Sequence, residues 1–376
     1  MADPQATIQV LLDELVTGDR ERGLQVAAYL DGQLIIDAWS GIADPTTGRA
    51  VDGETLFSVF STGKGVVATV IHLLAERGQL GYAVPIGQYW PEFGTHGKAG
   101  ITVRQALAHT AGLPQLPDGV QPADLCDWEG ICRGIAELSP LWEPGTQPGY
   151  HALSYGWLLG EVARRVDGRA FAQIVREEIC APLGIINLYF GIPDEVEARV
   201  ALMEIDPHAE PPPPLPADAL MLRAVPPSLQ PVAHFANRPD VRRASIPGGG
   251  GIMNARALAR HYAALAGDLP DASQLLATER LRLATTLQTD AMDLVLGVAG
   301  RRALGYSLGG PLSPMGDRAT AFGHSGAGGS IGFADPAYRF AFGLTKNRMV
   351  ANTPGEGTTN CVAAAVRAAL DIPEGA

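Results

Sequence analysis

The sequence predicts an α/β fold whose sheet is assembled from both ends of the chain, with a mainly helical lobe inserted between them. β-prone apolar runs occupy residues 24–40 and 319–346, whereas helical patterns fill most of the stretch from Ser61 to about residue 190. A chain of 376 residues with 46% apolar residues is long enough for two lobes. We expect an α/β lobe from residues 1–80 and 240–376 and a helical lobe from residues 81–239.

The amino-terminal elements are predicted from local patterns. The first twenty residues resemble a helix and lack the basic start, long apolar run and cleavage site of a secretory signal. Residues 24–30 and 33–40 are apolar and β-prone, and Asp31-Gly32 between them favours a type I′ hairpin. After the β-prone residues 56–61, the apolar spacing changes to that of one helical face. This change predicts a helix from about Ser61 to Gly78.

The rest of the chain alternates helical patterns, loops and strands. Helices are predicted at residues 154–166 and 170–180, and nine prolines between residues 207 and 231 predict a surface loop there, because proline disrupts both helices and sheet ladders. Four glycines at 248–251 are expected to form a flexible turn that borders the pocket. The final third predicts strands at 319–324, 329–334 and 339–346 and a last helix at about 357–370.

Composition and charge exclude several classes of function. The formal charge of −12 opposes binding to a phosphate backbone, so we expect no nucleic-acid partner. The sequence has no stretch of about 18 apolar residues, so we expect no membrane span and a cytoplasmic location. The four cysteines form no C-x-x-C pair, and no metal-binding motif is present. We therefore expect an enzyme or binding protein that works without metal or cofactor.

The strongest chemical signal is Ser61-Thr62-Gly63-Lys64, an S-x-x-K motif at the predicted start of a helix. Residues three apart share a helical face, so the Ser61 hydroxyl and the Lys64 amine can meet within one turn. The positive helix start should lower the pKa of both groups, and a desolvated lysine could then activate the serine as a nucleophile. The alternative is an N-cap serine followed by a solvated lysine.

The approach to this motif and three further motifs give the sequence a family resemblance. Residues 56–61 (LFSVFS), 105–113 (QALAHTAGL), 148–156 (PGYHALSYG) and 323–329 (GHSGAGG) follow one another in the order expected of the serine β-lactamase and penicillin-binding-protein superfamily. The chain most resembles class C β-lactamase-like carboxylesterases, the family VIII esterases, and related acyltransferases. The resemblance extends from about residue 8 to residue 370. It implies a β-lactamase-like fold with an antiparallel sheet flanked by helices.

The resemblance also implies roles for individual residues. Ser61 would attack the acyl carbonyl of a small ester or acyl donor, and Tyr150, its pKa lowered by Lys64, would take the proton as a phenolate. The backbone N–H groups of Ser61 and Ala327 would form the oxyanion hole. The substrate-binding positions would be those of Ala152, His324, Ser325 and Gly326. The resemblance implies no cofactor.

Two departures from the family pattern favour esters over β-lactams. His324 stands where the K-T-G lysine would present a permanent cation to a substrate carboxylate. Ala152 replaces the asparagine of Y-x-N and so removes an amide that could bind an acylamino side chain. We therefore expect a serine carboxylesterase. Acyl transfer to an alcohol or amine, and an inactive β-lactamase-like binding protein, remain the alternatives.

Other side chains near these motifs have simpler explanations. His109 and His151 could act as bases, but we expect both to be structural histidines that bond to the backbone. Tyr155 lies five residues after Tyr150 and could itself be the relevant phenol or simply fill the core. We favour Tyr150, because the P-G-Y phrase puts it at the tip of a loop.

Overall fold

The structure is a computed structural model, which describes residues 3–208, 214–267, 269–272, 274–350, 355 and 357–375. Its main element is a seven-stranded sheet with the order β3-β2-β1-β11-β10-β9-β8, and neighbouring strands are antiparallel. The predicted antiparallel sheet, formed from both ends of the chain, is therefore confirmed. The strands are β1 (Gly23–Leu30), β2 (Gln33–Asp44), β3 (Arg49–Ala50), β8 (Ser307–Leu308), β9 (Phe322–Ser325), β10 (Ile331–Asp335) and β11 (Phe340–Lys346).

The turn between β1 and β2 has the predicted backbone. Asp31 and Gly32 both have positive φ angles, 49° and 76°, as a type I′ hairpin requires. The strand ends differ from the predicted ends by a few residues at most. The largest differences are at β2, which continues to Asp44 rather than ending at residue 40, and at β9, which begins at Phe322 because residues 319–320 form a turn.

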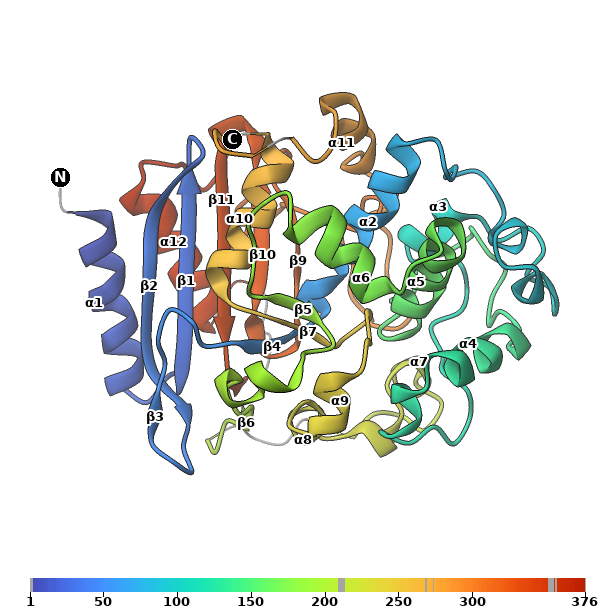
Figure 1. The fold of residues 1–376 in the computed structure, drawn as a ribbon, viewed down its shortest axis with the longest axis horizontal. Coiled ribbons are helices and arrows are strands. Elements are labelled where there is room, and N and C mark those ends of the chain that lie inside the picture. Colours follow the sequence, from blue (N-terminus) through green and yellow to red (C-terminus); the bar gives the residue numbers. More distant parts are fainter. Residues whose placement is uncertain are drawn as a thin grey trace.

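Helices cover both faces of this sheet (Figure 1). Val26 and Ala28 of β1 pack into one apolar cluster with α1 (Pro4–Thr17) and α12 (Gly357–Ala369). Ala27 and Tyr29, which alternate with them, belong to the larger cluster that includes α10 (Ala255–Ala266). The period-two alternation of a strand thus provides two apolar faces, and each face is buried by helices.

The S-x-x-K motif lies between a small sheet and a buried helix. Strand β4 (Phe57–Phe60) pairs with β7 (Gly251–Met253), which in turn pairs with β5 (Leu188–Phe190). A single 3₁₀ turn, Ser61–Gly63, follows β4 and leads into α2 (Lys64–Glu76). The predicted helix near Ser61 is therefore present. Residues Lys64 to Ala75 of α2 are all buried, so this helix lies at the centre of the molecule.

The remaining helices and strands lie mostly between β4 and β7 in the sequence. They are α3 (Val103–Leu107), α4 (Trp128–Glu137), α5 (Ser154–Asp167), α6 (Phe171–Val175), α7 (Leu220–Ala224), α8 (Val232–Ala236), α9 (Pro239–Arg243) and α11 (Thr278–Ala284), with β6 (Glu204–Ile205) parallel to β12 (Arg348–Met349). The predicted helix at 170–180 is α6 continued by a π-helical turn, Arg176–Cys180. The expected boundaries of the two lobes, near residues 81 and 239, stay a prediction.

The proline-rich stretch differs from the predicted loop. Residues 209–213 lie outside the described residues, but the rest of the stretch contains α7 and a 3₁₀ turn at Pro227–Leu229. Prolines occur there at helix starts, where no intrahelical N–H is needed. Two apolar side chains of these short helical turns, Ala224 and Leu229, are buried in the interior.

One further segment, for which the sequence predicted no helix or strand, lies against Tyr150. Residues 288–307, here called the 288–307 hairpin, fold back on themselves through isolated antiparallel bridges that join Thr289 to Arg302 and Met292 to Ala299. None of the helices in the described part of the chain is both long enough and apolar enough to cross a bilayer.

Candidate active site

Ser61 is held in a strained turn at the end of β4. Phe60, directly before it, has φ 49° and ψ −128°, a backbone conformation that non-glycine residues rarely adopt. The next residue, Thr62, donates its hydroxyl hydrogen to the carbonyl oxygen of Ser330 at 2.8 Å. This bond ties the turn to the segment that follows β9. The strain at Phe60 is therefore maintained by contacts to the large sheet.

Gly326 allows β9 to approach the Ser61 turn. A Cβ atom on Gly326 would lie 2.1 Å from the Val59 carbonyl oxygen and 2.8 Å from the Thr62 hydroxyl oxygen. Any larger residue would push the two segments apart. The substrate-binding role expected of Gly326 stays a prediction, and the packing explains why a glycine stands there.

Lys64 is fully buried and contacts Ser61 directly. Its Nζ lies 2.8 Å from the Ser61 Oγ, 2.6 Å from the Ala152 carbonyl oxygen and 2.5 Å from the Gly248 carbonyl oxygen. Two carbonyl oxygens can accept the two N–H groups of a neutral amine, which leaves the nitrogen lone pair for the Ser61 hydroxyl. The geometry therefore suits an amine that accepts a proton from Ser61.

The electrostatics of Lys64 agree with this arrangement. Burial lowers the pKa of Lys64 well below its usual value, and the positive charge of Arg302 lowers it further. The predicted direction of the shift is confirmed for Lys64. Its causes are desolvation and a second cation, whereas the sequence suggested the helix start.

Tyr150 lies beside the same serine. Its hydroxyl interacts with the side chain of Ser61, and the Lys64 Nζ lies 4.9 Å from the centre of its ring. Burial raises the pKa of Tyr150 to about 12, although this interaction with Ser61 and the charge of Arg302 lower it in part. The expectation that Lys64 lowers the pKa of this phenol below its usual value is therefore wrong. Desolvation dominates, so Tyr150 is a neutral phenol near pH 7.

The two histidines hold the Tyr150 loop in place. The His151 Nε2 accepts a hydrogen bond from the Leu113 backbone N–H at 3.0 Å, and its Nδ1 lies 2.6 Å from the Gly149 carbonyl oxygen. The His109 Nδ1 accepts the backbone N–H of His151 at 3.1 Å. Burial lowers the pKa of His151 to about 4 and that of His109 well below its usual value. Both are neutral and structural, as predicted.

Tyr155 belongs to the core beneath the site. It is fully buried, its ring stacks on His109 with centroids 4.8 Å apart, and the Lys64 Nζ lies 5.8 Å from its ring centre. Its pKa is raised by burial well above the usual value. The Tyr155 hydroxyl has no hydrogen-bond partner among the described residues, whereas the Tyr150 hydroxyl interacts with Ser61, so the geometry favours the predicted choice between the two tyrosines.

The predicted substrate-binding residues of β9 lie at different depths. His324 is buried, its Nδ1 donates to the Ser325 carbonyl oxygen at 2.7 Å, and its ring centre lies 6.3 Å from that of Tyr150. Burial, the charge of Lys64 and the charge of Arg302 lower the pKa of His324 to about 3. Ser325 is exposed. The uncharged imidazole ring of His324 therefore lies beside Tyr150.

Comparison with known proteins identifies the family of this site. A family model described as Beta-lactamase matches residues 8–366. The chain belongs to the Beta-lactamase family. LipL of Mycobacterium tuberculosis, described as an esterase/beta-lactamase, is 35% identical over 368 residues, which cover 93% of this chain and 82% of LipL. The resemblance inferred from the motifs is confirmed.

Solved structures of the Beta-lactamase fold superpose along nearly the whole chain. The structure of a family VIII carboxylesterase superposes with a TM-score of 0.87 and 33% sequence identity. The superposition covers 98% of this chain and 98% of the carboxylesterase. EstA from Arthrobacter nitroguajacolicus Rue61a has a TM-score of 0.88 and 31% identity, with 99% of this chain and 98% of EstA covered.

An apolar pocket opens beside Ser61 of this Beta-lactamase family member. It has a volume of about 70 Å³. It is lined by Phe60, Ser61, Ala152, Leu153, Val225, Leu229, Val232, Phe235, Gly249 and Ala327. Ser61 and Ala327, the two residues expected to form the oxyanion hole, therefore face the same space. The pocket holds no charged side chain among its lining residues, so it suits an uncharged group.

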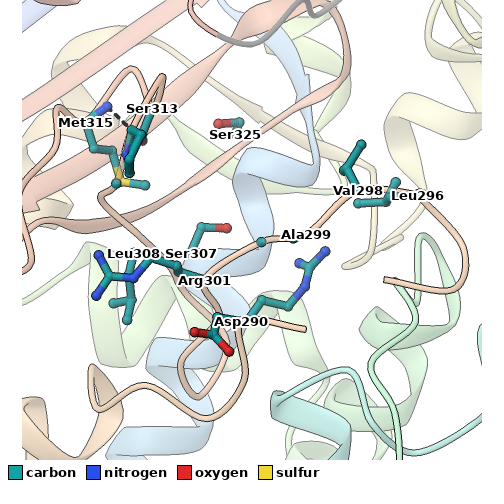
Figure 2. Close-up of a pocket in the computed structure, with 14 residues that line it drawn as sticks. Asp290, Leu296, Val298, Ala299, Arg301, Ser307, Leu308, Ser313, Met315 and Ser325 are labelled. Atoms are coloured by element: carbon teal, nitrogen blue, oxygen red, sulfur yellow. Dashed lines mark hydrogen bonds between the residues drawn. The ribbon is translucent and has the colours of Figure 1, made fainter. Parts of the chain in front are cut away.

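A second pocket, with a volume of about 350 Å³, lies at the end of β9 (Figure 2). In that view Ser325 lies on one side of the pocket and Asp290 and Arg301 on the other. The Arg301 Nη1 donates to the Gly309 carbonyl oxygen at 2.7 Å. Arg302 also lines this pocket and carries its permanent charge close to Tyr150.

Four contributors to this Beta-lactamase family site were missed or only partly foreseen from the sequence. The glycine run 248–251 was expected to form a turn, but Gly248 also supplies a carbonyl to Lys64. Leu229 comes from a stretch interpreted as a surface loop. Asp293 and Arg302 lie in a segment without a motif or clear periodicity, so no sequence signal pointed to them. Among the described residues, no group of three His, Cys, Asp or Glu side chains could bind a metal.

Proposed function

We propose that the protein is a carboxylesterase that forms an acyl-enzyme on Ser61, with Lys64 and Tyr150 as its proton-transfer pair. The observation that carries this proposal is the 2.8 Å contact between the buried Lys64 Nζ and the Ser61 Oγ. A buried amine with a lowered pKa loses its proton more readily than a solvated lysine, and the unprotonated amine can then accept the proton of the hydroxyl next to it, which becomes a nucleophile. The family and its esterase relatives support the same chemistry.

Acylation begins with Ser61. Its Oγ attacks the ester carbonyl carbon while its proton passes to the Lys64 amine. The negative charge on the carbonyl oxygen is stabilised by the backbone N–H groups of Ser61 and Ala327, which we propose as the oxyanion hole. The carbon–oxygen bond to the alcohol then breaks. Tyr150, a neutral phenol, gives the leaving oxygen its proton and recovers one from Lys64.

Deacylation reverses these proton transfers with water. Water takes the place of the departed alcohol and attacks the acyl carbonyl carbon, and its proton passes through Tyr150 to Lys64. The bond between the acyl group and the Ser61 Oγ breaks, and Oγ regains its proton. Because Lys64 must be unprotonated at the start of each half-reaction, its lowered pKa is needed twice in every turnover.

The apolar pocket supports a short, uncharged acyl or alcohol group as the part of the ester bound next to Ser61. A volume of about 70 Å³ admits only a few methylene groups. His324, neutral beside Tyr150, adds no positive charge for an acidic substrate. We therefore expect acetate and butyrate esters to be better substrates than long-chain esters.

Leu229→Ala is expected to change this chain-length preference. Leu229 is buried and lines the pocket, so its truncation lengthens the space available to the acyl chain. We expect the ratio of kcat/KM for p-nitrophenyl octanoate to that for the butyrate to rise about tenfold. Leu287→Ala, at an exposed leucine away from the pocket lining, is the control. An unchanged ratio in Leu229→Ala would remove this pocket from the substrate site.

The proposed function is tested by trapping the acyl-enzyme. With p-nitrophenyl butyrate we expect a burst of p-nitrophenol equal to one equivalent of enzyme wherever deacylation is the slower step. A fluorophosphonate should label the protein once, and peptide mass spectrometry should find the label on Ser61. A protein that neither turns over the ester nor reacts with the fluorophosphonate would instead be an inactive binding protein. Adding an alcohol or amine acceptor measures how much acyl group goes to transfer rather than to water.

A further inference from the structure

A buried ion pair lies next to the proposed proton-transfer pair. The Arg302 Nη2 lies 2.8 Å from the Asp293 Oδ2, and the two side chains are only 9% and 1% exposed. Both residues belong to the 288–307 hairpin. Removing two charges from water is costly, so a buried pair of this kind adds little stability by itself. Its position suggests a role in the chemistry.

Asp293 attaches this hairpin to the Tyr150 loop. Its Oδ1 accepts three backbone N–H groups, from Tyr150 at 3.0 Å, Val295 at 2.9 Å and Leu296 at 2.9 Å. A further backbone bond, from the Leu294 N–H to the Pro148 carbonyl oxygen at 3.0 Å, joins the same two segments. One carboxylate therefore holds both the backbone of Tyr150 and the guanidinium of Arg302.

Arg302 lies against the Tyr150 ring. Its Cζ is 5.1 Å from the ring centre, within the range of a cation–π contact. The ring also contacts His109, with centroids 4.9 Å apart, and His324, with centroids 6.3 Å apart. The phenol ring of Tyr150 is thus enclosed on several sides beside Ser61.

The charges that face this phenol come from four parts of the chain. Lys64 approaches from α2, His109 from the segment after α3, His324 from β9, and Asp293 and Arg302 from the 288–307 hairpin. Burial keeps the pKa of both histidines low, so they are neutral near pH 7. Arg302 then carries the permanent positive charge among these described groups, since Lys64 is also driven toward its neutral form.

We propose that Arg302, held by Asp293 against the ring of Tyr150, is a positioning residue that directs this phenol at Ser61 and favours the unprotonated form of Lys64. The inference rests on the proposed function, because it assigns a role in the proton transfers of that same site. A fixed guanidinium repels a second cation, so the ammonium form of Lys64 is disfavoured. The same charge favours the phenolate over the phenol and so makes Tyr150 a stronger acid toward the leaving alcohol.

The pH profile of kcat/KM for p-nitrophenyl butyrate separates this role from a structural one. In the intact enzyme the acidic limb follows protonation of Lys64, so activity falls as the pH falls through the pKa of that amine. Arg302→Gln removes the repelling charge and raises this pKa, so the acidic limb should move to higher pH by about one unit. Arg302→Lys keeps a positive charge and should leave the limb close to its original position.

A double variant guards against misfolding. Arg302→Gln alone leaves Asp293 buried without its partner, which can destabilise the hairpin. Asp293→Asn combined with Arg302→Gln removes both charges, while the amide oxygen introduced at position 293 can still accept the backbone N–H of Tyr150. This double variant should shift the limb in the same direction as Arg302→Gln. Circular dichroism and thermal melts establish that each variant is folded.

The outcomes distinguish this inference from the proposed function. The role of Arg302 is contradicted if the acidic limb of the pH profile stays in place in the folded Arg302→Gln or double variant. It is also contradicted if the limb moves equally in Arg302→Lys. If Ser61 is labelled and the burst is observed, the esterase mechanism stands even then. If no labelling and no burst occur in the unmodified protein, the proposed function itself fails, and with it the inference.

Discussion

Replacing Ser61 with alanine is expected to lower kcat for p-nitrophenyl butyrate about 10⁴-fold or more. The variant lacks the hydroxyl that lies 2.8 Å from the Lys64 Nζ, so no acyl-enzyme can form. The remaining rate should come from the oxyanion site and from water. Steady-state kinetics and the loss of the initial burst measure the effect.

The matched control for this substitution is Ser40→Ala. Ser40 lies on β2 and bonds to Asp13 at the surface, so its loss should leave kcat and KM close to those of the unmodified enzyme. If Ser61→Ala turned over the ester at the unmodified rate, another nucleophile would be responsible. The assignment of Ser61 would then be wrong.

Replacing Lys64 with methionine is expected to lower kcat/KM about 10³-fold. Methionine fills a similar space but cannot accept the Ser61 proton, and general-base contributions of this size are typical. Lys64→Arg should be about as inactive, because a guanidinium keeps its proton at all accessible pH values. If Lys64 acts as a neutral base, Lys64→Arg should be inactive. If Lys64 provides only a positive charge, Lys64→Arg should keep its activity. Kinetics across pH 5 to about pH 10 provide the comparison.

Lys98→Met is the control for loss of a buried lysine. Lys98 is as buried as Lys64, and its Nζ also donates to a backbone carbonyl, that of Ala136 at 2.8 Å, but it contacts no residue of the site. Its substitution should affect stability without a comparable loss of kcat. An active Lys64→Arg variant would show that position 64 provides charge only and would contradict its role as a base.

The parts of the site that were predicted depend on local spacing. Ser61 and Lys64 meet because three residues span most of a helical turn, and this holds for any S-x-x-K at a helix start. The β1–β2 hairpin follows equally from Asp31 and Gly32, whose preference for positive φ is a local property. Predictions of this kind need no knowledge of the rest of the chain.

The parts that were not predicted depend on distant contacts. Tyr150 and Asp293 are 143 residues apart in the sequence, and only the folded chain reveals that one binds the other. The pKa of Tyr150 is set first by how deeply the ring is buried, which spacing cannot supply. Leu229 was assigned to the surface because prolines surround it, but they start short turns whose apolar residues face inward.

The pairing of β1 with β11 affects how the molecule is made. Leu24 lies opposite Lys346, so the two neighbouring strands at the heart of the sheet are separated by almost the entire chain. During translation the amino-terminal hairpin emerges early, with one row of backbone N–H and C=O groups unpaired until the last strand leaves the ribosome. Such long-range closure is slow, because the entropy of closing a long loop must be overcome before the two strands can pair. The nascent protein is therefore exposed to aggregation through that open edge until β11 has paired with β1.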